Sequence, residues 1–196
     1  MSALKVPAGH GESEYIEKRS SFLGIVEPVS SEEEARAVIA AVKKQHRDAR
    51  HNCWCYLIQG SAERYSDDGE PQGTAGIPML EVFRKAGVSN AVCVVTRYFG
   101  GVLLGAGGLL RAYTKAAKDA LENSGITEVI PVRELTLRCP YSLLERIRLE
   151  ITAAEAEILS TDYAADITLS IRIPEAKAVS FSERIFDLTS GTVKCE

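Results

Sequence analysis

The sequence predicts an α+β protein of two domains, residues 1–127 and 128–196, on three observations. First, a chain of 196 residues is long enough for one large domain or two small ones. Second, apolar residues recur at helical spacing in some segments and alternate in others. Third, this pattern changes character near residue 127, which places the boundary at about residues 128–131. The hydrophobic content of 45% and charged content of 26% are ordinary for a globular protein.

The first half of the N-terminal domain begins with a strand pair. Residues 14–29, EYIEKRSSFLGIVEPV, are expected to form an extended ribbon. Residues 30–49 predict a helix, because serine can cap its start, three glutamates occupy the first turn and basic residues lie near the end. NCWCYLIQG, residues 52–60, is typical of a buried strand.

The second half of this domain alternates loops and helices around one more strand. After the loop SDDGEPQGTAG, residues 66–76, the segment 77–87 is expected to be helical. AVCVVTRY, residues 91–98, is rich in β-branched residues and predicts a second buried strand. From about Gly107, apolar residues recur at intervals of three and four, which indicates an amphipathic helix that stops at Gly125.

The C-terminal domain shows the order β-α-β-β-α-β. Apolar and polar residues alternate over 134–139 and 166–173, whereas residues 143–151 and 174–191 have helical spacing. A half-polar antiparallel sheet with helices on its other face is the ferredoxin-like arrangement. Its outward positions carry Thr, Ser, Asp and Arg without an aromatic, which favours protein docking or plain solvation over base stacking.

Charge and cysteine content point to the cytoplasm. The net charge of −4 argues against wholesale non-specific binding of nucleic acid. No apolar run is long enough to cross a bilayer, and the N-terminus lacks the apolar region of a signal peptide. The five cysteines are an odd number. His51, Cys53 and Cys55 suggest zinc, but adjacent positions of one strand give poor tetrahedral geometry, so buried core cysteines are the favoured interpretation.

The glycine-rich stretch TRYFGGVLLGAGGLLRAY, residues 96–113, joins a strand to a helix and contains five glycines. Such a junction is a ready anion site, because a helix N-terminus offers unpaired N–H groups. It lacks the Gly-Lys-Ser/Thr of a phosphate loop, and Leu110 occupies the third glycine place of the dinucleotide pattern. The glycines could instead permit positive φ and close packing of helix on sheet.

Flanking charges favour an anionic ligand at this stretch. Arg97 precedes the glycines, and Arg111, Lys115 and Lys118 are spaced to form one basic stripe. In the loop 66–76, three carboxylates could hold Mg²⁺, but pairing with Arg97 or Arg111 is favoured. We expect both loops to share a cleft with these ligand-binding residues: Asp67, Asp68, Glu70, Gly73, Thr74, Arg97, Tyr98, Gly100, Gly101, Gly105, Gly107, Gly108, Arg111 and Lys115.

Four segments together resemble the IMPACT family: SDDGEPQGTAGIP, VVTRYFGGVLLGAGGLLRAY, EKRSSFLG and ARHNCWCYLIQG. The resemblance is strong over residues 13–120, with Arg19 where lysine is common. It implies an N-terminal domain with the fold of ribosomal protein S5 domain 2. It also implies a ferredoxin-like C-terminal domain similar to domains III and V of elongation factor G. Eukaryotic members of the family regulate translation initiation, whereas bacterial members have no established reaction.

The charge and cysteine content predict a cytoplasmic protein, and the resemblance implies a translation-associated regulatory role. Its partner would be RNA, the ribosome or a translation-regulatory protein, held in the glycine-rich, arginine-flanked cleft, with no membrane contact and no specificity for DNA. A rival interpretation is a Mg²⁺-dependent enzyme acting on a phosphorylated small molecule or RNA end. Because no residue stands out as a nucleophile or general base, catalysis is disfavoured and no cofactor is expected. A protein-interaction module without a small ligand is the third possibility.

Overall fold

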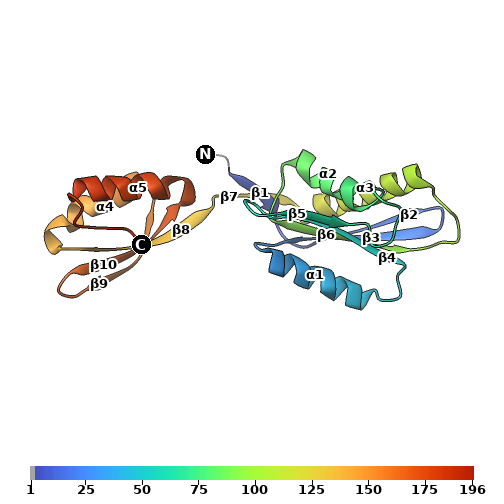
Figure 1. The fold of residues 1–196 in the computed structure, drawn as a ribbon, viewed down its shortest axis with the longest axis horizontal. Coiled ribbons are helices and arrows are strands. Elements are labelled where there is room, and N and C mark those ends of the chain that lie inside the picture. Colours follow the sequence, from blue (N-terminus) through green and yellow to red (C-terminus); the bar gives the residue numbers. More distant parts are fainter. Residues whose placement is uncertain (1–2) are drawn as a thin grey trace. The chain divides into compact units, whose positions relative to one another are not determined.

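The computed structural model describes residues 3–196 and separates into two compact units, residues 4–129 and 130–196 (Figure 1). We expected the boundary between residues 127 and 128, where the sequence pattern changes. Each unit has its own hydrophobic core. No helix within residues 3–196 is both long and apolar enough to cross a membrane.

The N-terminal unit is built on an antiparallel sheet with the strand order β2-β3-β6-β4-β5. Its strands are β2 (Gly11–Glu17), β3 (Ser20–Pro28), β4 (His51–Leu57), β5 (Glu63–Ser66) and β6 (Ala91–Tyr98). The predicted ribbon and both predicted buried strands are therefore confirmed. A separate ribbon pairs β1 (Leu4–Pro7) with β7 (Ile126–Val129), and the sequence pattern did not reveal it.

Helices cover both faces of this sheet (Figure 1). Helix α1 (Glu32–Gln45) packs on one face, while α2 (Gly76–Ala86) and α3 (Ala106–Ser124) pack on the other. All three helices were predicted. Ser31 caps α1 by accepting a hydrogen bond from the backbone N–H of Glu34, as the capping pattern indicated.

The C-terminal unit has a three-stranded antiparallel sheet with the order β8-β10-β9. Its elements are β8 (Val132–Cys139), a 3₁₀ turn (Tyr141–Leu143), α4 (Leu144–Ala153), β9 (Glu157–Tyr163), β10 (Ile167–Pro174) and α5 (Glu175–Leu188). Strands β8 and β10 alternate buried and exposed residues, and the buried set packs against both helices.

The sequence predicts a strand after the last helix of this unit, but the structure has only a single-residue bridge there. Cys195 forms a single bridge with Leu137, and Thr136 exchanges two backbone hydrogen bonds with Glu196, of 2.7 and 2.9 Å. After α5 the chain turns at Gly191, which has a positive φ of 78°. Residues 192–194 are not paired with any strand of the described chain.

Candidate functional site

The acidic loop, which we define as residues 66–75, lies against the end of β6. The Arg97 guanidinium donates from Nη1 to Oε1 of Glu70 at 2.7 Å. The Tyr113 hydroxyl, from α3, donates to the same oxygen at 2.8 Å. The Arg97 and Glu70 side chains are only 6% and 3% exposed. Burial raises the pKa of Tyr113, so its hydroxyl keeps its proton and remains a donor.

The rest of the Arg97 guanidinium is enclosed by the domain itself. Its Nη2 lies 3.5 Å from the Ser20 hydroxyl, and its central carbon lies 5.5 Å from the ring centroids of both Phe22 and Phe99. Its Nε is buried and has no hydrogen-bond partner among the described residues. Arg97 is therefore enclosed by side chains of its own domain, and its role in ligand binding stays a prediction.

Each of the three carboxylates has a different partner. Asp67 accepts hydrogen bonds from the backbone N–H groups of Gly73, Ala75 and Gly76 at 2.8–3.0 Å, which caps the start of α2. Asp68 accepts from Lys43 Nζ at 2.6 Å and from the backbone of Asn52 at 2.7 Å. Glu70 pairs with Arg97, as expected, and none of the three forms an ion pair with Arg111 in the described chain.

The separate partners of the three carboxylates can be compared with the requirements of the Mg²⁺ site considered above. Mg²⁺ binds best where carboxylate oxygens converge on one point and leave room for water. Across residues 3–196, no group of three or more Asp, Glu, His or Cys side chains converges in a way that could hold a metal ion. Around the carboxylates, Gly73 adopts a positive φ of 78° and Thr74 donates its hydroxyl to the carbonyl of Pro71 at 2.6 Å. These two predicted ligand residues therefore shape the turn of the loop.

The glycine-rich loop, residues 99–105, is approached closely by the protein's own backbone. A Cβ on Gly100 would lie 2.0 Å from the carbonyl carbon of Arg19, at the tip of the β2–β3 hairpin. Gly101 and Gly105 adopt positive φ angles of 82° and 72° and face open space. In α3, a Cβ on Gly108 would lie 2.9 Å from the Leu104 side chain, whereas Gly107 has room for one. The packing and positive-φ interpretation therefore accounts for four of the five glycines.

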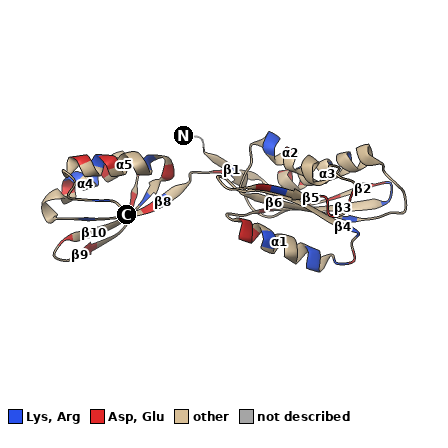
Figure 2. Cartoon of the chain, viewed as in Figure 1, with Lys and Arg blue, Asp and Glu red and all other residues tan. Residues whose placement is uncertain are grey.

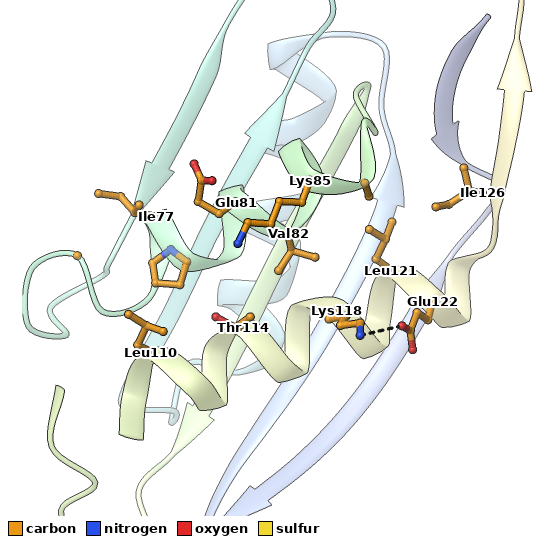
Figure 3. Close-up of a pocket in the computed structure, with 13 residues that line it drawn as sticks. Ile77, Glu81, Val82, Lys85, Leu110, Thr114, Lys118, Leu121, Glu122 and Ile126 are labelled. Atoms are coloured by element: carbon orange, nitrogen blue, oxygen red, sulfur yellow. Dashed lines mark ion pairs between the residues drawn. The ribbon is translucent and has the colours of Figure 1, made fainter. Parts of the chain in front are cut away.

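The predicted basic stripe on α3 is largely neutralised by its own helix. Lys115 pairs with Asp119 at 2.6 Å, and Lys118 pairs with Glu122 at 3.5 Å (Figure 3). Arg111 is exposed and forms no ion pair within the part of the chain that the structure describes. Tyr98 donates its hydroxyl to Asp48 at 3.3 Å, away from the helix. Basic and acidic residues are interspersed along both units (Figure 2), and the role of the stripe in ligand binding stays a prediction.

Instead, the loop exposes apolar side chains. We name these residues the apolar loop surface: Phe99, Val102, Leu103 and Leu110, which are 40%, 41%, 83% and 45% exposed. Leu110 also lines a groove of about 720 Å³ between α2 and α3, together with Ile77, Val82 and Leu121 (Figure 3). Sequence reasoning named only the glycines and charges here. The signal for the apolar surface was the run of large apolar residues between the glycines.

The same reasoning missed the residues that surround Arg97, namely Ser20, Phe22 and Tyr113. A signal for the burial of Arg97 was present in the sequence. Side chains two residues apart point to the same face of a strand, and Arg97 follows Cys93 and Val95 on the face that carries the main core. The alternation of side chains along β6 therefore places Arg97 on the face that α2 and α3 cover, rather than at the surface.

The residues considered for zinc have packing roles. Nδ1 of His51 lies 2.8 Å from the carbonyl oxygen of Asp68, and the Cys53 thiol donates to the carbonyl oxygen of Asp67 at 3.0 Å. Cys53, Cys55 and Cys93 are fully buried, which confirms the core-cysteine interpretation for them. Burial raises the pKa of the Cys53 and Cys55 thiols well above their ordinary range.

These thiols are expected to resist alkylation in the folded protein. At neutral pH iodoacetamide should label Cys195 first, since it is the only partly exposed cysteine of the described residues. Cys53, Cys55 and Cys93 should react only after unfolding, because all three are fully buried and out of reach of the reagent. Mass spectrometry of peptides labelled with and without urea measures this order. Labelling of Cys53 as fast as Cys195 in the native protein would contradict it.

Comparison with known proteins places the chain. Residues 18–121 match the Impact N-terminal domain, and residues 137–192 match a domain of unknown function, DUF1949. The chain belongs to the IMPACT family. The IMPACT family member YvyE of Bacillus subtilis is 38% identical over 183 residues, which covers 92% of this chain and 84% of YvyE. YigZ of Escherichia coli is 35% identical over 181 residues, covering 90% and 89%.

Two solved structures are also similar to this chain. One crystal structure of a hypothetical protein has a TM-score of 0.71 at 34% identity and covers 100% of this chain and 97% of that one. A more distant structure is that of Yih1, described as a two-domain translational regulator. It covers 60% of this chain and 47% of that chain, at 28% identity and a TM-score of 0.40.

Proposed function

We propose that this member of the IMPACT family is a cytoplasmic, translation-associated regulatory protein that binds a protein partner through the apolar loop surface. The observation that carries the proposal is the exposure of Leu103, which is 83% accessible on a loop whose Gly100 packs against the β2–β3 hairpin. A loop that exposes several large apolar side chains to water is typical of an interaction site. Family membership supports the translational part, because eukaryotic members are regulators of translation.

A protein partner fits the surface better than RNA does. Phosphate contacts need accessible cations, yet Arg97 is buried and Lys115 and Lys118 each face a carboxylate one turn away. Only Arg111, among the predicted basic ligands, is exposed without an ion pair in the described chain. The apolar surface, by contrast, continues through Leu110 into the groove between α2 and α3 (Figure 3).

The finer fold relationships are part of the same proposal. We propose that the N-terminal unit shares the fold of ribosomal protein S5 domain 2, which the four family segments imply. We propose that the C-terminal unit is ferredoxin-like and related to domains III and V of elongation factor G. The position of Glu196 beside Thr136 supports this, because it adds the start of a fourth strand next to β8. Both relationships agree with a role in translation.

The test is co-sedimentation with intact bacterial ribosomes, with purified elongation factors and, separately, with deproteinised ribosomal RNA. The wild-type protein should bind ribosomes or a factor but not the bare RNA. Leu103→Asp should weaken that binding about 30-fold, since a charge at the centre of an apolar contact removes a hot spot of roughly 2 kcal/mol. Folding should be unchanged, because the side chain is already in water.

Two matched variants make this result interpretable. Leu149→Asp changes an equally apolar residue, 70% exposed in the C-terminal unit, and should leave binding intact. Arg111→Gln removes an exposed cation next to Leu110 and should have little effect on a protein contact. Binding to bare RNA that Arg111→Gln abolishes and Leu103→Asp spares would contradict the proposal and restore the RNA interpretation.

A further inference from the structure

The sheet face that carries α1 is only partly covered. On the opposite face α2 and α3 lie side by side, whereas α1 packs mainly over β4 and β6 (Figure 1). Beside α1, above β2 and β3, the structure holds a groove of about 660 Å³. We call it the acidic groove. It shares no residue with the apolar loop surface, so a role for this groove is independent of the proposed function.

The floor of the acidic groove is apolar for a simple reason of strand geometry. Successive side chains of β3 alternate, so Phe22 and Val26 enter the core under α2 and α3 while Leu23 and Ile25 point to the α1 side. Both are only half-buried there, since no second helix lies over them. Val38 and Ala41, on the flank of α1, form one wall of the groove.

The outer rim of the groove is acidic. Ser13 donates its hydroxyl to the carbonyl of Ala116 in α3, which turns the neighbouring residues Glu12 and Glu14 of β2 toward the groove. Glu27 of β3 lines the same side. Among the described lining residues there is no lysine or arginine, and the other titratable groups are His10 and His46.

His10 lies between two carboxylates of this rim, those of Glu12 and Glu27. Its two ring nitrogens lie 2.9 Å from Glu12 and 2.5 Å from Glu27. Hydrogen bonds with Glu12 and then Glu27 raise the pKa of His10 above its ordinary value, although the ring is largely in water. One imidazole is shared between two carboxylates, and among residues 3–196 Glu14 accepts a single hydrogen bond, from the Ser21 hydroxyl at 3.1 Å. The rim therefore keeps an excess of negative charge at neutral pH.

We propose that the acidic groove binds a cationic amphipathic helix of a partner protein. Its apolar stripe would cover Leu23, Ile25 and Val38, and its lysines or arginines would face Glu12, Glu14 and Glu27. A helix placed beside α1 would complete a two-helix layer like the one on the opposite face. The seven residues of β2 span about 23 Å, the length of a helix of roughly 15 residues.

The experiment uses the full chain and a fluorescently labelled 15-residue peptide of lysine and leucine with helical spacing. A peptide of identical composition, shuffled to remove the apolar stripe, is the second probe. Fluorescence anisotropy at moderate salt should show binding of the amphipathic peptide that is at least about tenfold tighter than that of the shuffled one, because both floor and rim contribute. Amide NMR shifts should concentrate at Leu23, Ile25 and Val38.

A first set of variants tests the acidic rim of the groove. The triple change Glu12→Gln, Glu14→Gln and Glu27→Gln should weaken binding of the amphipathic peptide about tenfold or more. A control triple with the same charge change, Glu33→Gln, Glu145→Gln and Glu183→Gln, should change it less than about twofold, because these exposed carboxylates do not line the groove.

A further pair of variants places a cation on α1. Ala41→Lys puts a positive charge into the groove and should weaken binding of the amphipathic peptide about tenfold, whereas Ala40→Lys, equally exposed on α1 but outside the groove, should not. Equal effects of both triple variants, or equal affinity for both peptides, would overturn the proposal. So would a self-association that Ala41→Lys abolishes in sedimentation without peptide, since the occupant would then be a second copy of the chain.

Discussion

Replacing Glu70 with alanine is expected to lower the free energy of unfolding by about 3–5 kcal/mol. The change leaves the guanidinium of Arg97 buried without its counter-ion, and it removes the acceptor of the Tyr113 hydroxyl. A buried charge that loses its partner keeps its full cost of desolvation, which exceeds what the pair itself contributed. Urea unfolding followed by circular dichroism measures the change.

Two further variants identify the cause of this loss. Glu81→Ala removes an exposed partner of Arg84 and should cause a far smaller loss, because exposed ion pairs contribute little. The double variant Glu70→Met with Arg97→Met should recover most of the stability lost in Glu70→Ala, since no charge remains buried. A double variant less stable than the single one would show that the loss comes from shape and packing instead.

Gly100→Ala is the second change with a large expected effect, a loss of roughly 3 kcal/mol from forced overpacking. The new methyl group would lie 2.0–2.4 Å from the backbone of Arg19 and Ser20, so the loop and the hairpin would have to separate. That separation would also break the hydrogen bond of 3.2 Å that the Gly100 N–H donates to the Ser20 hydroxyl. Thermal and urea unfolding quantify the loss.

Gly107→Ala is the matched control for this prediction. Its new methyl group would contact only the tip of the Arg111 side chain, at 3.8 Å. Because alanine favours helices over glycine by up to about 1 kcal/mol, stability should stay the same or rise slightly. Similar losses from Gly100→Ala and Gly107→Ala would mean that the hairpin contact is not what makes Gly100 sensitive.

The local features of the fold were predictable because their causes are local. Ser31 and the glutamates behind it specify the start of α1, and Gly125 specifies the end of α3, through interactions within a few residues. In the same way, the alternation of apolar and polar residues predicted the strands β8 and β10. The pairing of β1 with β7 was not predictable, since it joins segments more than a hundred residues apart and leaves no pattern within either.

The candidate site was predicted in its parts but not in its assembly. The sequence showed that acidic residues near 67–70 could meet Arg97, and Glu70 does so. It could not show that Tyr113 would donate a hydrogen bond to Glu70 or that the Phe22 ring would pack against Arg97, because Tyr113 and Phe22 come from two other elements. The neutralised basic stripe was within reach of sequence reasoning, since Asp119 and Glu122 follow Lys115 and Lys118 by four residues.

The span of these contacts along the chain has a consequence for folding kinetics. Asp67 reaches the N–H of Gly76 across nine residues, so the acidic loop and α2 can organise early. Ser20 and Gly100 are 80 residues apart, and Glu70 and Arg97 are 27 apart. Contacts that close large loops form late, after most of the entropy of the chain has been lost. Interactions absent from the transition state slow unfolding without accelerating folding. We therefore expect the buried pair and the hairpin contact to act chiefly on the unfolding rate, and so on the lifetime of the native protein.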